Sequence, residues 1–369
     1  MLNLLGSSKF RMRAGLLLGG VMTLSAGSTL IINEVTKPSS TTEDVADTAA
    51  ETSPYNSAWQ HVAADFTMEH HLGNPRVQYW IRWYQAHPVM FDDYAQNSAI
   101  WLPYVIQQVE QRGMPGELAL LPFIESGYNP LARSPTGPRG IWQLSANTAS
   151  ELGLKNSLGY AARQDVVAAT PAALDYLESL HERYFPHNWE LTLAAYNAGP
   201  GRILQTQIAG KSNSYWSLSL SQETMNYVPK LLALAAIIAN PHRYGIDLPA
   251  LNDTTRFTSI DLSRSLNLST AARLAGVDVA QLRDLNPGYV GQWISGSLLI
   301  PAQSQAHFKN QLDKFLNDDS PLHYVVAEGD TLSAISQTTG VSVNAIRHSN
   351  QLAQNSTLRV GQTLVLDSA

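Results

Sequence analysis

The stretch LALLPFIESGY, residues 118–128, decides the fold of the central part of this chain. Its apolar run ends at a single carboxylate, Glu125, and the sequence then becomes polar and tight at Ser126-Gly127. A carboxyl group placed where an apolar helix gives way to a loop is partly desolvated, and desolvation raises its pKa. Such a group can stay protonated near neutral pH and donate its proton to a leaving oxygen. The ordinary alternative is a solvated glutamate at a helix end, although a glutamate at a helix C-terminus opposes the macrodipole.

Helical patterns continue outward from this stretch. Apolar side chains recur at three- and four-residue steps from Val77 to Tyr84, on its N-terminal side. On the other side, Thr170-Pro171 supplies an N-cap and a first-turn proline, and Asn188 can cap the next helix. No strand alternation occurs before residue 250. We therefore predict an all-α domain over residues 58–250.

The C-terminal third contains an internal repeat. Residues 276–286 match residues 340–350, and each unit has the pattern of a strand, two short helices and a strand. We predict two small α+β modules of βααβ type, at residues 256–302 and 322–367, joined by a polar connector at 303–320. The fold class is therefore mainly α, with an all-α domain followed by these modules.

Composition and charge exclude several classes of function. The 369 residues carry a net charge of -6, and no Lys/Arg-rich stripe or RNA-binding signature is present, so we expect no nucleic-acid partner. The chain has no cysteine. That excludes disulfides, thiolate metal sites, cysteine nucleophiles and a lipid-modified N-terminal cysteine, so the chain is not a lipoprotein.

The N-terminus has the pattern of an export segment. Residues 1–32 contain a basic start followed by a charge-free apolar stretch at 14–32, and Ala26-Gly27-Ser28 offers a cleavage site. A cleaved signal peptide is the favoured interpretation, and an uncleaved membrane anchor is the alternative. Residues 33–57, rich in Thr, Ser, Ala and acids, predict a flexible linker. Either way we expect an exported protein of the cell envelope or periplasm.

Four segments of the all-α domain carry polar groups suited to one glycan-binding cleft. They are Glu125-Ser126, the run from Ser134 to Gln143, Ala195-Tyr196-Asn197-Ala198-Gly199, and the run from Glu223 to Lys230. Any one of these motifs is weak evidence, but the four in this order are specific. With the flanking runs from Asn74 to Asn240, they resemble the lytic transglycosylases that share the goose-type lysozyme fold.

The resemblance implies an activity and a set of roles. The activity is cleavage of the β-1,4 bond between N-acetylmuramic acid and N-acetylglucosamine in peptidoglycan, with 1,6-anhydro ends and Glu125 as the single general acid and base. No second acid lies in the Glu125, Gln143 or Tyr196 segments, although a conventional glycosidase needs two. The implied substrate-binding residues are Ser126, Ser134, Gln143, Tyr196, Asn197 and Tyr227, with Tyr227 also donating to the Glu125 carboxyl. For Ser126 a turn or cap is an equal alternative, and for both tyrosines the alternative is core packing.

The second C-terminal repeat contains Tyr324-Val325-Val326, Gly329-Asp330-Thr331-Leu332 and Gly361-Gln362-Thr363-Leu364. Through these runs it resembles a LysM domain, a module that binds N-acetylglucosamine-containing glycans. The resemblance implies glycan contacts from Gly329, Asp330, Thr331 and Asn350. The first copy lacks the Gly-Asp-Thr-Leu turn and is a degenerate LysM-like module. The expected partner is therefore the peptidoglycan glycan strand, with membrane association through the N-terminal segment as a further possibility.

Two other functions remain open from the sequence. A lysozyme-like hydrolase would need a second carboxylate, for which Glu223 and Glu190 are the nearest candidates, and Glu223 is better explained as a helix cap. A non-catalytic peptidoglycan-binding scaffold is the second alternative, against which the complete set of cleft residues argues. We predict no cofactor and no metal, because the adjacent His70-His71 cannot share a helix face.

Overall fold

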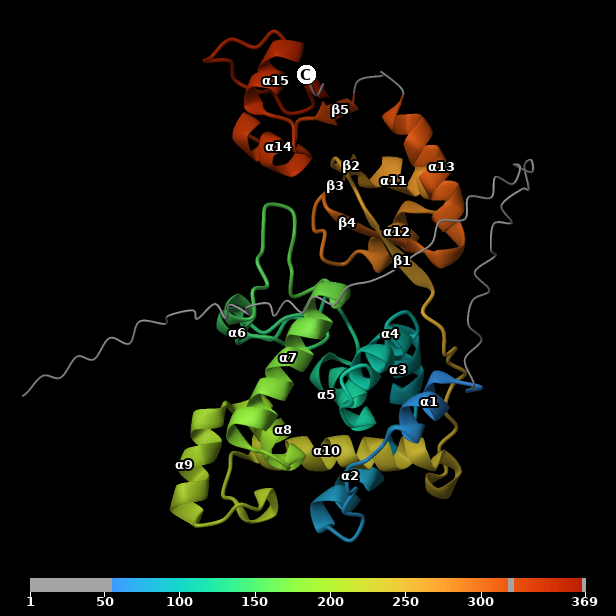
Figure 1. The fold of residues 1–369 in the computed structure, drawn as a ribbon, viewed down its shortest axis with the longest axis vertical. Coiled ribbons are helices and arrows are strands. Elements are labelled where there is room, and N and C mark those ends of the chain that lie inside the picture. Colours follow the sequence, from blue (N-terminus) through green and yellow to red (C-terminus); the bar gives the residue numbers. More distant parts are fainter. Residues whose placement is uncertain (1–54, 318–321, 367–369) are drawn as a thin grey trace, which may run out of the picture. The chain divides into compact units, whose positions relative to one another are not determined.

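The computed structural model describes residues 55–317 and 322–366 of the chain. The predicted export signal at residues 1–32 lies outside the described residues, as does most of the predicted linker at 33–57. Figure 1 shows the helices of the first domain, coloured from blue to yellow, and the smaller C-terminal modules in orange and red.

The first domain is built from helices, which confirms the prediction of a mainly α chain with an all-α domain. Its elements are α1 (Ala58–Ala64), α2 (Pro75–Ala86), α3 (Met90–Ser98), α4 (Leu102–Glu110), η1 (Gly116–Leu120), α5 (Leu121–Ser126), α6 (Ala146–Glu151), α7 (Val166–Tyr184), α8 (Trp189–Ala198), α9 (Pro200–Gly210), η2 (Tyr215–Ser217), α10 (Gln222–Ala239) and η3 (Pro241–Tyr244).

Helix α10 forms the centre of this domain and packs against α1, α2, α5 and α8 (Figure 1). From Leu231 to Ile238 every residue is buried, which is the pattern of a helix enclosed on all sides. Its first turns are more polar and less buried. The buried half therefore fixes the helix in the core, and the polar half is free to present side chains to a cleft.

A proline lies inside α10, and an arginine compensates for it. Pro229 has no N–H, so the carbonyl of Met225, four residues earlier, loses its helical partner. The Arg76 guanidinium, from the first turn of α2, donates to that carbonyl at 3.3 Å. The same side chain donates to the Trp216 carbonyl at 2.8 Å. Arg76 thereby joins α2, η2 and the beginning of α10.

Helix α7 begins earlier than the sequence indicated, so the predicted start at Thr170-Pro171 is wrong. The N-cap is Asp165, whose side chain accepts from the Ala168 amide, and Pro171 lies inside the helix. The carbonyl freed by this proline belongs to Val167, and the Tyr104 hydroxyl donates to it at 3.3 Å. A long-range donor thus allows the helix to continue through the proline. The predicted cap at Asn188 is confirmed, with its side chain accepting from the Leu191 amide.

The two C-terminal units have the predicted strand–helix–helix–strand order. The first contains β1 (Phe257–Asp261), β2 (Leu266–Asn267), α11 (Leu268–Ala275), α12 (Val279–Leu285), β3 (Trp293–Ile294), β4 (Ser297–Pro301), η4 (Ala302–Ser304) and α13 (Gln305–Leu316). The second contains β5 (Leu322–Val325), α14 (Leu332–Thr339), α15 (Val343–Ser349) and β6 (Thr363–Leu366).

In each unit the outer strands pair antiparallel. Phe257 lies opposite Pro301 in the first unit, and Leu322 lies opposite Leu366 in the second. Helix α13 differs from the expected polar connector, because Phe308 is fully buried in the core of the first unit. The first module therefore extends beyond residue 302.

Candidate active site

Glu125 lies in the last turn of α5, a short helix whose other side chains are mostly in the core. The helix ends because Gly127 adopts a left-handed conformation, with φ of 62°. Its N–H donates a hydrogen bond to the Phe123 carbonyl at 3.1 Å. The next residue, Tyr128, is fully buried and donates its hydroxyl to the Ala119 carbonyl at 2.8 Å. These bonds join the residues after Glu125 to the helical turns before it, so the backbone that carries the carboxyl is held in place.

The Tyr227 hydroxyl donates to Glu125 Oε1 at 2.5 Å, as the resemblance implied. Burial raises the pKa of Glu125 to about 7, while the Tyr227 hydrogen bond and the Lys230 charge lower it in part and Glu223 raises it. Near neutral pH the carboxyl is therefore divided between its protonated and ionised forms. A group in that state can both give and take a proton within one reaction.

One wall of the site is the loop from Gly140 to Gln143. Gly140 has φ of 78°, and a Cβ at this position would lie 1.8 Å from the Arg163 carbonyl oxygen. Only glycine fits this contact. Gln143 also has a positive φ, of 47°, and its amide donates to the Gly140 carbonyl at 2.8 Å. The close packing on Arg163 therefore holds the Gln143 side chain at the edge of the cavity.

The opposite wall comes from α8. The Tyr196 hydroxyl donates to the Trp142 carbonyl at 2.8 Å, which ties this helix to the Gly140–Gln143 loop. The Asn197 side-chain oxygen Oδ1 accepts a hydrogen bond from Thr224 Oγ1 at 2.8 Å, and its side-chain nitrogen Nδ2 donates to Glu223 Oε1 at 3.4 Å. These bonds fix the orientation of the Asn197 amide.

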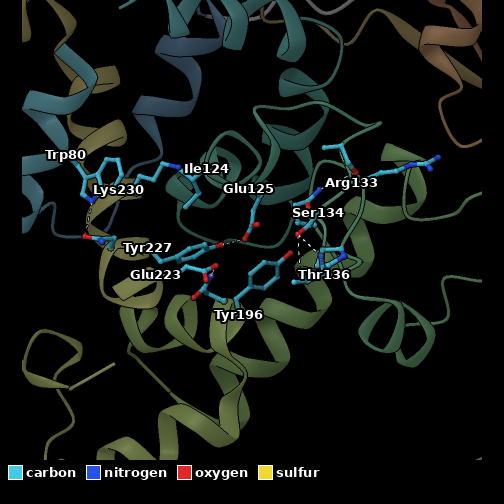
Figure 2. Close-up of a pocket in the computed structure, with 15 residues that line it drawn as sticks. Trp80, Ile124, Glu125, Arg133, Ser134, Thr136, Tyr196, Glu223, Tyr227 and Lys230 are labelled. Atoms are coloured by element: carbon cyan, nitrogen blue, oxygen red, sulfur yellow. Dashed lines mark hydrogen bonds between the residues drawn. The ribbon is translucent and has the colours of Figure 1, made fainter. Parts of the chain in front are cut away.

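The walls enclose a cavity of about 710 Å³ with Glu125 near its middle (Figure 2). Its lining residues are Trp80, Ile124, Glu125, Ala132, Arg133, Ser134, Thr136, Pro138, Gln143, Tyr196, Asn197, Glu223, Asn226, Tyr227 and Lys230. The structure thus brings together all the predicted residues of the first domain except Ser126. The Ser126 hydroxyl lies 3.0 Å from the Ile141 carbonyl and 3.1 Å from the Pro122 carbonyl, so it stabilises the turn.

Several lining residues were not anticipated from the sequence. Trp80 belonged to a helical apolar pattern and was taken as part of a buried face. Asn226 and Lys230 lie in the run from Glu223 to Lys230 that was predicted to reach the cleft, but neither was singled out as a site residue. Helical spacing places Lys230 beside Tyr227. Glu223 is also at the cavity, and the prediction that it caps α10 is wrong, because Ser221 is the N-cap.

Of the four residues suggested for glycan contact in the second module, Asp330, Thr331 and Asn350 form hydrogen bonds within that module. Asp330 accepts from the Tyr324 hydroxyl at 2.8 Å, and Thr331 caps α14. Gly329 supplies a positive φ of 84° in the turn. Asn350 donates to the Val365 carbonyl at 2.7 Å and joins α15 to β6. Glycan binding by these residues stays a prediction.

One cluster in the described residues has donor atoms close enough for a metal ion. Ligand atoms of His61, Asp65 and Glu110 lie within 4.8 Å of one another. His61 bonds instead to Glu110 at 2.6 Å and to Asp253 at 2.8 Å. Burial alone would lower the pKa of His61, but Glu110 and Asp253 raise it above its usual value. A protonated imidazole therefore balances the negative charge of these carboxylates. None of these residues lines the Glu125 cavity.

The family models identify the all-α domain and its carboxyl-centred cleft as those of a lytic transglycosylase. The family model described as "Transglycosylase SLT domain" matches residues 104–218, which carry Glu125, Gln143 and Tyr196. A model described as "Lytic transglycosylase MltD, LysM-like domain" matches residues 256–316, and "LysM domain" matches residues 324–367.

The identity to one relative specifies the family. The membrane-bound lytic murein transglycosylase D of Escherichia coli K12 is 34% identical over 313 residues, covering 79% of this chain and 69% of the relative. The chain belongs to the membrane-bound lytic murein transglycosylase D family.

Shorter similarities involve other transglycosylases. The membrane-bound lytic murein transglycosylase F of Saccharophagus degradans is 42% identical over 96 residues, covering 25% of this chain and 18% of that protein. A solved structure, the lytic transglycosylase Slt of Pseudomonas aeruginosa in an inactive mutant form, is 24% identical and covers 41% of this chain and 26% of its own, with a TM-score of 0.31.

None of the helices in residues 55–317 and 322–366 is both long enough and apolar enough to cross a bilayer.

Proposed function

We propose that this enzyme cleaves the β-1,4 bond between N-acetylmuramic acid and N-acetylglucosamine in peptidoglycan and leaves 1,6-anhydro-N-acetylmuramic acid ends. The observation that carries the proposal is the Glu125 carboxyl, which lies in a glycan-sized cavity with a pKa of about 7 and accepts a hydrogen bond from Tyr227. The names of the family and of its Escherichia coli member support the murein substrate.

The reaction balances with Glu125 alone and without a water molecule. Protonated Glu125 gives its proton to the glycosidic oxygen while the bond from that oxygen to C1 of the muramic acid breaks. The C6 hydroxyl of the same sugar then attacks C1, and its proton returns to the Glu125 carboxylate. Because the nucleophile belongs to the bound substrate, its position is set by binding. The Tyr227 hydroxyl stabilises the ionised carboxylate between the two steps.

A hydrolase is the competing function, since Glu223 lines the same cavity. Glu223 is exposed, and within the described residues its carboxylate accepts one hydrogen bond, a long one of 3.4 Å from the Asn197 side chain. That environment suits a solvated carboxylate better than a base that must hold a water molecule. A non-catalytic scaffold is disfavoured because the buried Glu125 carboxyl costs folding free energy when it ionises.

The deciding experiment is mass spectrometry of muropeptides released from purified peptidoglycan. Products one water lighter than those of a lysozyme would support transglycosylation. Products with reducing ends would refute it in favour of hydrolysis, and retained binding without release would favour the scaffold.

We expect Tyr227→Phe to shift the pH dependence of the reaction. The hydroxyl lowers the pKa of Glu125, so its loss should move the alkaline limb of the kcat profile to higher pH. It should also lower kcat by about 10- to 100-fold, the usual effect of losing a hydrogen bond to a charged group. The measurement is kcat between pH 5 and 9, with the exposed Tyr79→Phe as the control. An unmoved alkaline limb would contradict the role given to Tyr227.

We also propose that the LysM module at residues 322–367 holds the enzyme on the glycan strand. Deletion of residues 322–369 should weaken binding to insoluble peptidoglycan by about tenfold or more, because the second attachment point is lost. Turnover of short soluble fragments should change much less. Sedimentation of the protein with peptidoglycan measures the first effect, and equal sedimentation of both forms would count against glycan binding by this module.

For location, we propose the cell envelope or periplasm, with a cleaved signal peptide in residues 1–32 and, as the alternative, a membrane anchor at residues 14–32. The substrate lies in the envelope, and the Escherichia coli relative is called membrane-bound.

A further inference from the structure

The Lys230 ammonium lies at one end of the active-site cavity and has no carboxylate partner there. Its side chain is partly buried, and it forms no hydrogen bond or ion pair with any residue in 55–317 or 322–366. Desolvation lowers the pKa of Lys230, and the charge of Glu125 raises it in part. A partly buried cation with three unused donors is costly unless another group pairs with it.

The neighbour of this ammonium is an aromatic ring. Lys230 Nζ lies 5.6 Å from the centre of the Trp80 ring, within the range of a cation–π contact. The indole N–H donates to Asn226 Oδ1 at 3.4 Å, and this bond helps to orient the ring beside the cavity. Trp80 is partly exposed and lines the cavity, so the ring can also meet a sugar face. We call this group, Trp80, Asn226 and Lys230, the tryptophan end.

The other end of the cavity differs in chemistry. Figure 2 shows Glu125 between the tryptophan end and a second group that contains Arg133, Ser134 and Thr136. Arg133 is exposed, so water solvates its charge. Lys230 has no comparable solvation. The tryptophan end is therefore the place where an anion on the substrate would gain most from pairing.

We infer that the tryptophan end is a subsite for a carboxylate carried by the muramic acid substituent of the substrate. The inference rests on the proposed function, which brings muramic acid into this cavity. Two carboxylates have the required chemistry: the lactyl carboxylate of a peptide-free muramic acid, and a carboxylate of the stem peptide. Either would accept hydrogen bonds from the Lys230 ammonium while the sugar packs against Trp80.

Binding to an inactive variant tests the subsite without turnover. The full-length chain carrying Glu125→Gln, with and without Lys230→Met, is titrated calorimetrically with three sets of short glycan fragments. The first carries stem peptides, the second has free lactyl groups, and the third is the second after its carboxyl groups are converted to amides. Glutamine at position 125 is neutral, so the Lys230 change cannot act through the charge of the catalytic carboxyl. The exposed Lys155→Met serves as the control, since it removes the same charge outside the cavity.

We expect Lys230→Met to weaken binding of carboxylate fragments by about tenfold or more, the scale of a charge-assisted hydrogen bond. Binding of the amidated fragments should not change, and neither should any binding by Lys155→Met. The fragment set that loses affinity identifies which carboxylate is bound. An equal loss for all three sets would mean that Lys230 only packs in the wall, and would overturn the inference, as would no loss for any set.

The proposed function can fail separately from this inference. Reducing-end products from the active enzyme would refute transglycosylation, while a selective loss in the binding experiment would still support the carboxylate subsite.

Discussion

Glu125→Gln should abolish release of soluble fragments from peptidoglycan, with kcat lowered by about 10³-fold or more. The amide keeps the size of the side chain and can still accept from Tyr227, but it cannot donate or receive the proton that both steps require. General acid–base catalysis contributes about 10²- to 10⁴-fold, and here one group carries both steps. The measurement is the rate of soluble product release at pH 6.

The same substitution should stabilise the fold, which separates loss of chemistry from loss of structure. The pKa of Glu125 is about 7 in the folded protein, against a model value of 4.5, so ionisation costs the folded state free energy. That cost begins near the unfolded pKa, grows as the pH rises, and is complete above the folded pKa. Glu125→Gln should therefore raise the free energy of unfolding at pH 8, by at most about 3 kcal/mol, and leave it nearly unchanged at pH 4.

Two further variants make the result specific. Glu182→Gln, at an exposed position of α7, should behave as the wild type in both measurements. Glu223→Gln tests the hydrolase alternative, since it removes the other carboxylate at the cavity. If it abolished activity as completely as Glu125→Gln, the single-carboxyl mechanism would be wrong.

Gly140→Ala should have the largest effect on stability. The new Cβ would lie 1.8 Å from the Arg163 carbonyl oxygen. The Cβ is fixed to one backbone and the oxygen belongs to another, so one of the two loops must move. The positive φ of 78° adds strain of its own. Together these effects should lower the free energy of unfolding by about 3 kcal/mol or more. Gln143 lies on the displaced loop, so activity should fall as well.

The chain offers a matched control in the same loop. Gly137 also has a positive φ, of 108°, but a Cβ there would have no atom within 4 Å. Gly137→Ala should therefore lower the free energy of unfolding only through the strain of its positive φ. The difference between the two variants in urea denaturation gives the cost of the contact with Arg163, and equal midpoints would show that the contact does not constrain the loop.

The part of the site that the sequence predicted consists of residues in compact motifs. Glu125, Gln143, Tyr196, Asn197 and Tyr227 each lie in a short run whose polarity contrasts with its surroundings. Asn226 and Lys230 share the run of Tyr227, but Trp80 lies in no such motif. Trp80 sits in an apolar helical pattern, and nothing in that pattern separates a ring at the edge of a cavity from one in the core.

In the fold, too, local sequence signals predicted some elements, while tertiary contacts decided others. Local signals placed α8 correctly, since Asn188 bonds within its own helix. They misplaced the start of α7, because a proline normally marks the first turn and only tertiary contact with Tyr104 allows Pro171 to lie further in. Helix α13 was taken for a connector because its pattern is largely polar, while the burial of Phe308 depends on the module it packs against.

The bond from Arg76 to the Met225 carbonyl constrains the order in which this enzyme can evolve. Pro229 removes the N–H that would bond this carbonyl in a regular helix, and the arginine takes that place. Replacement of Pro229 by an ordinary residue would supply the missing N–H and make part of the arginine's role redundant. Loss of Arg76 is therefore tolerated better after loss of Pro229 than before it, so the size of its effect depends on a position 153 residues away in the sequence. In natural relatives the two residues should be found together, or the proline should be missing first.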